Sequence, residues 1–458
     1  MPLFVFLPTD AVIWLIPCLI LSAVFFARRS PAAAARWKQV FGRPSAQASA
    51  VLLAAFLAVA VLDSIHVRPL VSEGPSGTPA YASAASSVLD LALKPVIAER
   101  ERSYSSPFAV REFDKTPAVR GGMPVREFAL LKGTPRGITT EGARNLDLGK
   151  RVLAGLLLAS ALLGAAAAAG LVLQAKGRKP REALWRFRGA VAAAAVLVIA
   201  GSVLAFTWGG YHPLGTDKTG NDVLFQAVKS LRTAFALGTL ATLAMLPFAV
   251  TLGIAAGYFR GWVDDIVQYL YTTISSIPSV LLIAASALMI QVFIDQHPAL
   301  LPTSLERGDA KLFFIAVIIG ITSWAGLARL LRAETLKLSG LDFVTAARSC
   351  GVPDSRIMLR HVLPNVLHIV LIVSVLGFSD IVLYEAVLAY IGVGVDPSMN
   401  SFGSMINAAR NEMSRTPAVW WNLAAAFIFM VSVVLSANLF ASSVRDAFDP
   451  KSARRSGK

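Results

Sequence analysis

Runs of about twenty apolar residues recur along the chain, separated by polar segments, and each run is long enough to cross the hydrocarbon core of a bilayer as one helix. Nine such runs lie at roughly residues 3–26, 46–64, 151–174, 189–208, 233–256, 266–294, 312–331, 366–390 and 421–440. The pattern therefore predicts an all-α, polytopic helical membrane protein.

Composition supports this class. The 458 residues are 55% hydrophobic and only 16% charged, which leaves too few polar side chains to cover a soluble globule of this size. The net charge of +15 collects in short loops, as expected beside anionic lipid headgroups. No basic stripe is interleaved with aromatic residues, so membrane lipid is an expected partner and nucleic acid is not.

The placement of Lys and Arg predicts the orientation, because cytoplasmic loops collect them. Residues 176–188 and the tail 451–458 are strongly basic, and residues 28–43 agree with them. Nine spans with a cytoplasmic C-terminus place the N-terminus outside. The first run lacks a preceding basic region, so it reads as a retained span rather than a signal peptide.

The chain divides at about residue 188. We expect a transmembrane hairpin at residues 1–64, an extracytoplasmic polar segment at 65–149, and a third span with a basic cytoplasmic linker at 150–188. The polar segment has few large apolar residues, so it is either docked on a partner or a poorly ordered linker. The third span is rich in Ala and Gly, which suits close helix packing.

Residues 343–364 form a polar segment, marked by Gly and Pro, between two long apolar runs. A short helix ending near Gly351 would present Thr345, Ala346 and Ala347 as a low-profile face. Pro353 would block its continuation. Small side chains allow another protein to approach closely, while charged residues pair around the rim. The segment thus indicates a docking surface, the alternative being an ordinary loop that links two spans.

This spacing resembles the signature loop of ATP-binding cassette (ABC) importer permeases. The positions that carry the resemblance are Thr345, Ala346, Ala347, Arg348, Gly351, Pro353, Asp354, Leu363 and Pro364. Further motifs follow the order of the dipeptide and oligopeptide (peptide/nickel) importer permeases. They are His212-Pro-Leu-Gly-Thr-Asp217, Gly220-Asn-Asp-Val-Leu224, Gly257-Tyr258, Ser276-Ile-Pro-Ser279, Ile391-Gly-Val-Gly394 and Val444-Arg-Asp-Ala-Phe-Asp-Pro450.

The resemblance implies a six-helix permease core at residues 189–450, with a coupling loop at 340–364, a basic tail at 451–458 and about three extra spans before the core. It implies a bacterial inner-membrane subunit that imports peptides or peptide-like solutes by alternating access. The implied partners are a second permease in a heterodimer, two ABC ATPases and an extracytoplasmic solute-binding protein. The implied entry segment contains His212, Gly215, Thr216, Asp217, Gly220 and Asp222.

Candidate chemistry within the chain is sparse. There is no phosphate-binding loop of the form G-x-x-x-x-G-K-[ST], and Cys18 and Cys350 are too distant in sequence to suggest a pair or a metal site. We expect no catalytic residues, cofactor or metal in this chain, and ATP with Mg bound by partner subunits. His212 and Asp217 suggest an acid–base pair, but a capped turn before a helix explains Asp217 more simply.

Two carboxylates stand in an apolar run, where each costs at least about 2.5 kcal/mol unless it is paired or faces water. Asp380 and Glu385 are therefore candidates to line a translocation path, although a spacing of five does not place them on one helix face. Glu385 alternatively bonds to neighbouring backbone. Pro278 is a candidate gating kink.

Besides the importer permease, two other classes of function stay open from the residues alone. A self-powered secondary transporter or channel would use Asp380 and Glu385 as ion sites. An intramembrane enzyme would need a nucleophile with its base, or a metal set, within the spans.

Overall fold

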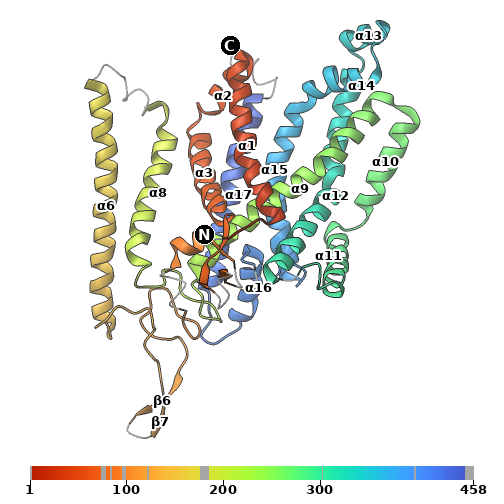
Figure 1. Cartoon of the computed structure of the whole chain (residues 1–458). Coiled ribbons are helices and arrows are strands. Elements are labelled where there is room, and N and C mark those ends of the chain that lie inside the picture. The colour runs from red at the N-terminus through yellow and green to blue at the C-terminus, as the bar shows by residue number, and fades with distance from the viewer. Residues whose placement is uncertain are drawn as a thin grey trace. The chain divides into compact units, whose positions relative to one another are not determined.

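The computed structural model describes residues 3–73, 79–82, 85–94, 100–120, 123–175, 185–301, 303–396 and 399–448 (Figure 1). The chain forms two compact units. Unit 1 comprises Met1–Val5, Phe41–Arg232 and Asn400–Ser436, and unit 2 comprises Phe6–Val40, Thr233–Met399 and Ala437–Lys458. The predicted division at residue 188 is not a boundary between them. Parts of two predicted segments, the basic linker at 176–184 and the C-terminal residues 449–458, lie outside the described residues.

Within the described residues, nine helices are long and apolar enough to cross a membrane. They are α1 (Pro8–Arg29), α3 (Pro44–Asp63), α6 (Glu141–Ala175), α8 (Arg188–Thr207), α9 (Val223–Phe259), α11 (Ser279–Gln296), α12 (Ser304–Leu338), a continuous run that ends in α15 (Leu363–Tyr390), and α17 (Trp421–Phe448). Six of the nine begin at or after Arg188. The predicted all-α class, with six spans preceded by three more, is confirmed.

Unit 1 packs α3, α6 and α8 side by side (Figure 1). Small residues permit the close approach: a Cβ on Gly155 of α6 would lie 2.7 Å from the backbone of Val203, and one on Gly189 of α8 would lie 2.0 Å from the Pro44 carbonyl oxygen. Close packing of the Ala- and Gly-rich third span therefore occurs at Gly155.

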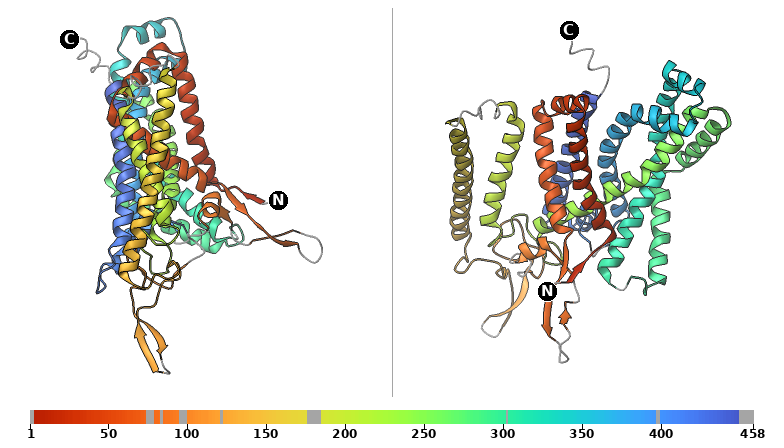
Figure 2. Two further views of the ribbon diagram at one scale, coloured as in Figure 1. Left: turned by 90° about the vertical axis from the view of Figure 1, so that its left-hand side faces the viewer. Right: turned by 45° about the horizontal axis from the view of Figure 1, so that its top comes forward.

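The strands of unit 1 are short and make small antiparallel sheets. One sheet orders β1 (Leu3–Val5), β2 (His66–Arg68) and β5 (Ser86–Ser87), and two hairpins pair β3 (Leu70–Glu73) with β4 (Pro79–Tyr81) and β6 (Thr116–Arg120) with β7 (Met123–Glu127). The β6–β7 hairpin projects away from α6 and α8 (Figure 2). The unit also contains α4 (Val88–Ala92), α16 (Phe402–Glu412), the start of α9 and most of α17.

Part of the polar segment packs on the rest of unit 1. Tyr104, 4% exposed, joins a buried cluster with Val223 of α9, Met405 of α16 and Trp421 of α17. The indole nitrogen of Trp421 donates to the Thr216 carbonyl oxygen at 3.0 Å. The surface on which residues 100–113 dock is thus supplied by this same chain.

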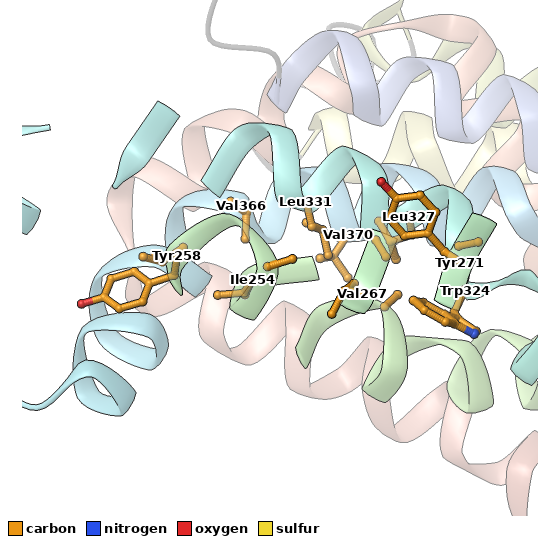
Figure 3. Close-up of a cluster of buried hydrophobic side chains, with 14 of the residues drawn as sticks. Ile254, Tyr258, Val267, Tyr271, Trp324, Leu327, Leu331, Val366 and Val370 are labelled. Carbon is orange, nitrogen blue, oxygen red and sulfur yellow. The ribbon is translucent and has the colours of Figure 1, made fainter. Parts of the chain in front are cut away.

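Unit 2 contains α1 with α2 (Pro31–Val40), α10 (Gly261–Ser276) and α11, most of α9, and the helices from α12 to α15. A large buried cluster in this unit joins α9, α10, α12 and α15 (Figure 3). On α9, Gly253 and Gly257 face α12: a Cβ on Gly257 would lie 2.6 Å from the Arg332 carbonyl oxygen. The backbone amide of Thr9 in α1 donates to the fully buried carboxylate of Asp309 in α12 at 3.2 Å.

The expected span at residues 266–294 is two helices rather than one kinked helix. Helix α10 ends at Ser276, Ile277 is extended, and Pro278 is the N-cap of α11. Proline has no amide hydrogen to donate and disfavours a helical residue before it, so the chain leaves the helix there. Of the two, only α11 is long and apolar enough to span.

Candidate functional site

The coupling region begins with α13 (Asp342–Ser349), a helix of two turns. Gly351 follows it with φ +73°, where its amide donates to the Arg348 carbonyl and the Val352 amide donates to the Ala347 carbonyl. This bond pair is the Schellman end of a helix, which favours glycine at the left-handed position. Pro353 then precedes α14 (Asp354–Ile357). The predicted short helix and its end at Gly351 are confirmed.

The small-residue face is narrower than predicted. Thr345 and Ala346 are exposed, but Ala347 is half-buried and packs against the large cluster of unit 2. The helix is anchored by Val344, which is 2% exposed. Because α13 turns by about 100° per residue, the side that carries Val344 inward also carries Ala347, three positions later.

Tyr258, at the end of α9, ties the coupling region to that helix. Its hydroxyl donates to Asp354 Oδ1 at 2.6 Å, and the Arg348 guanidinium lies 5.2 Å from its ring centroid. Arg348 Nη2 lies 3.7 Å from Asp354 Oδ1, so the predicted pairing of charges around the rim occurs there. We call these three residues the coupling clip. Figure 3 shows Tyr258 at the edge of the buried cluster, its hydroxyl pointing away from the other labelled side chains.

The rest of the predicted loop is helical. A π-helical turn, η1 (Met358–Val362), joins α14 to α15, and the Leu363 amide donates to the Met358 carbonyl. Pro364 has no amide hydrogen, and the Asn365 side chain donates to the His361 carbonyl oxygen at 2.6 Å. A π turn accommodates a proline inside a helix by shifting the bonding pattern. The loop ending at Leu363-Pro364 is therefore corrected to a break of four residues, 350–353, between helices.

A second set of contacts braces the same end of unit 2. The guanidinium of Arg332 in α12 binds the carboxylate of Asp264 in α10 through two hydrogen bonds. Arg260, at φ +57° in the turn before α10, donates to the Ser339 hydroxyl at 2.9 Å. The turn after α9 is thus fixed to α12 just before α13 begins.

The entry segment lies in unit 1, between α8 and α9. Gly215 and Gly220 have φ +70° and +78°, and a Cβ on Gly220 would lie 2.0 Å from the Glu101 carbonyl oxygen. The Thr216 amide donates to the Ser105 carbonyl, and the Glu101 amide donates to the Gly220 carbonyl, each at 3.1 Å. The two glycines thus allow residues 101–105 to lie directly on the entry segment.

His212 stands between two buried carboxylates. Its Nδ1 is 2.7 Å from Asp222 Oδ2, and its Nε2 is 3.8 Å from Glu101 Oε1. Burial alone would lower the pKa of His212, but the two carboxylates outweigh it and raise that pKa to about 9. Burial would likewise raise the pKa of Glu101, yet His212 and two backbone amides that donate to it lower that pKa.

His212 pairs with Asp222 rather than with Asp217, which closes a turn before the helix, in agreement with the simpler explanation. Asp217 accepts hydrogen bonds from the amides of Thr219 and Asn221, at 2.8 and 2.9 Å, and closes the turn before α9. Asp222 caps α9 instead, because its Oδ1 accepts from the Phe225 amide at 2.9 Å. The carboxylate that caps the helix is also the one that holds His212.

The two carboxylates of α15 lie in different surroundings. Glu385 is 5% exposed, whereas Asp380 is exposed, in agreement with a spacing that does not share a helix face. Pro278 is exposed between α10 and α11. Their roles in a translocation path stay predictions. Across the described residues there is no group of three His, Cys, Asp or Glu side chains that could hold a metal, and Cys18 and Cys350 are both free and exposed.

Residues 249–454 match the family described as the binding-protein-dependent transport system inner membrane component. The glutathione transport system permease protein GsiD of Pectobacterium atrosepticum is 32% identical over 243 residues, which cover 52% of this chain and 73% of that protein. The chain belongs to this family. The oligopeptide transport system permease protein OppC of Haemophilus influenzae is 29% identical over 245 residues, which cover 54% of this chain and 72% of that protein. The dipeptide transport system permease protein DppC of Alkalihalophilus pseudofirmus is 30% identical over 240 residues, which cover 52% of this chain and 72% of that protein.

Membership makes this chain the inner-membrane permease subunit of an ABC importer that works with a solute-binding protein and an ATPase. The matched region contains the whole coupling region, including Tyr258. A self-powered transporter is not favoured by these relatives.

Proposed function

We propose that the chain is one of two different permease subunits in an importer of peptides or peptide-like solutes. The transport permeases it resembles are named for oligopeptides, dipeptides and glutathione, which are all peptides. Two ABC ATPase subunits complete the complex, and they bind the ATP and its Mg²⁺. An extracytoplasmic protein delivers the solute.

The coupling region carries this proposal. Helix α13 exposes the small side chains of Thr345 and Ala346, so a groove on an ATPase subunit can approach it closely. Gly351 stops the helix, and the coupling clip fixes it to the end of α9. When the ATPases close on ATP, a push on α13 passes to α9 through Tyr258 and to α15 through the continuous helix that begins at Asp354. The spans then move as rigid bodies between inward-facing and outward-facing states.

The orientation that we propose is supported by the length of α9. Its 37 residues extend about 55 Å at 1.5 Å per residue, more than the roughly 30 Å of the hydrocarbon core. This length supports our proposal that the entry segment and the coupling region face opposite sides of the membrane. We assign the coupling region and the C-terminus to the cytoplasm, and the entry segment and the N-terminus to the outside.

A role in the path is proposed for one face of α15. Asp380 is exposed on a membrane helix, where a charge is tolerated if it faces water or a partner subunit. We place Asp380 toward the second permease or the water-filled path, with buried Glu385 nearer the outer mouth. Pro278, which separates α10 from α11, is the proposed hinge for gating.

The direct test is co-purification of the complex from its native membrane in mild detergent. Ala346→Trp places a bulky side chain on the exposed face of α13, and Gly351→Pro cannot adopt a positive φ. We expect both variants to retain the second permease and to lose the ATPases, with Ala346→Ser as the matched control that keeps them. Full recovery of the ATPases with both variants would reject α13 as their docking site.

A further inference from the structure

A charged cavity of about 290 Å³ lies in unit 2, at the opposite end of α12 from the coupling region. It is lined by Gln291, Ile294 and Asp295 of α11, Ser304, Arg307 and Lys311 of α12, and Asp396. Its size is near the lower limit of ligand pockets, which suits a small ligand. Under the proposed orientation this end of α12 is extracytoplasmic.

One side of the cavity is suited to an ammonium group. The Gln291 side-chain nitrogen donates to both carboxylate oxygens of Asp295, at 2.9 and 3.0 Å, and so fixes the carboxylate. The Gln291 amide oxygen is buried and has no hydrogen-bond partner among the described residues. Such an acceptor is unfavourable while it is unsatisfied. A ligand N–H donor placed beside Asp295 would satisfy it.

The other side is suited to an anionic group. Arg307 and Lys311 are four residues apart, so they share a face of α12. The Arg307 Nε donates to the Leu301 carbonyl at 2.8 Å, which holds the guanidinium beside the turn between the two helices. Asp309, between them in sequence, lies on another face and binds Thr9 of α1. The cavity thus receives two cations from α12, a fixed carboxylate from α11 and the carboxylate of Asp396.

We propose that this cavity binds a small zwitterion, with its ammonium at Gln291 and Asp295 and its anionic group at Arg307 and Lys311. Walls of both signs disfavour a ligand that carries only one charge, because such a ligand leaves one wall unpaired. A short peptide and the headgroup of an aminophospholipid both have this chemistry. The proposal rests on the proposed function only for the side of the membrane that the cavity faces.

The test uses the complete transporter, purified without its solute-binding protein. Binding of radiolabelled L-alanyl-L-alanine is compared with that of its N-acetyl and C-amide derivatives, which each lack one charge. Retention of phosphatidylethanolamine against phosphatidylcholine is measured by native mass spectrometry. The variants are Lys311→Gln and Gln291→Leu. The control is Lys337→Gln, because Lys337 has a 72% exposed side chain and lies at the other end of α12.

If the peptide is the ligand, both variants weaken its binding at least about tenfold, the control does not, and the single-charge derivatives bind weakly. If the lipid headgroup is the ligand, the variants lose phosphatidylethanolamine instead. No change in either measurement would overturn the proposal. Peptide uptake by the wild-type complex with its solute-binding protein, in liposomes, separates the two ideas: absent uptake rejects the proposed cargo, whatever the cavity binds.

Discussion

The hydroxyl of Tyr258 is the atom through which the coupling clip joins α9 to α14. Tyr258 is buried, with 4% of its surface exposed. The substitution Tyr258→Phe keeps the aromatic ring and removes only that hydrogen bond. Because the Asp354 side chain is 44% exposed, we expect a loss of about 1 kcal/mol, which is less than for a buried bond to a charged group. That corresponds to about a fivefold drop in peptide transported per ATP hydrolysed, measured in proteoliposomes.

Asp354→Asn is the matched control, since an amide oxygen can still accept the hydrogen bond from Tyr258. It should retain most of the coupling, while Tyr258→Ala, which also removes the ring under Arg348, should lose more than Tyr258→Phe. Equal coupling in Tyr258→Phe and the wild type would show that the hydroxyl has no part in transmission.

The ion triad of His212, Asp222 and Glu101 predicts a pH dependence of the entry segment. The folded pKa of His212, about 9, lies above its ordinary value of 6.5, so its stabilising contribution is complete below about pH 6.5 and is lost as the pH rises through about 9. The pKa of Glu101 is lowered, so its contribution is present above its ordinary value of 4.5 and is lost as the pH falls through its folded pKa.

We therefore expect residues 100–108 to exchange their amide hydrogens faster above about pH 9, after correction for the intrinsic pH dependence of exchange. Hydrogen exchange with mass spectrometry would detect the change. In His212→Gln the corrected rates should be faster at neutral pH and should no longer rise across this range. A wild-type profile that is flat between pH 7 and 10 would contradict the assignment.

Helices α9 and α12 pack closely where α9 has glycine residues. A Cβ on Gly257 would lie 2.6 Å from the Arg332 carbonyl oxygen, whereas one on Gly326 of α12 would meet nothing within 4 Å. Gly257→Ala should thus force the helices apart and lower the thermal stability of the purified protein by several degrees. Gly326→Ala should be neutral or stabilising by up to about 1 kcal/mol, since alanine favours a helix. A shift of the melting temperature that is equal in both variants would contradict close packing at Gly257.

Short sequence patterns predicted an element correctly in those cases where one or two residues determine its geometry. The apolar runs located the spans, although the run at 266–294 contains both α10 and α11, and the Gly351–Pro353 pair located the end of α13. Pro278 was read as a kink because a proline inside a helix and one between two helices give the same apolar pattern. The π turn before Pro364 was missed for a related reason: an extra residue in one turn leaves no mark on a short polar stretch.

Contacts between distant parts of the chain could not be predicted from the sequence. Tyr258 and Asp354 are 96 residues apart, and no periodicity links them. Glu101 lies in a polar stretch far from His212 in sequence, and no pattern in either segment indicated that their side chains would meet. The side of α13 that faces the protein could not be predicted either. It depends on where the buried cluster lies and not on the small size of Ala347.

For the molecule as a whole, the N-terminal region does not form a unit of its own. Helices α1 and α2 belong to unit 2, where Thr9 meets Asp309 and Trp37 meets Phe448 with ring centroids 5.7 Å apart. Helices α3 and α6 belong to unit 1. Each unit therefore combines part of the N-terminal region with part of the region shared with the relatives.

This arrangement predicts that the six-span part will not accumulate alone. A chain that begins at Trp185 removes Thr9 from the buried Asp309 and Glu101 from His212, and the loss of such partners from buried polar groups is costly. We expect membrane yield, measured by quantitative blotting, to fall at least about tenfold. Replacing residues 116–127 with a Gly-Ser turn is the control, because Thr116 and Glu127 are register partners and all of β7 is exposed. That control variant should accumulate normally. A normal yield of the truncated chain would contradict the prediction and show that the six-span part folds without the N-terminal region.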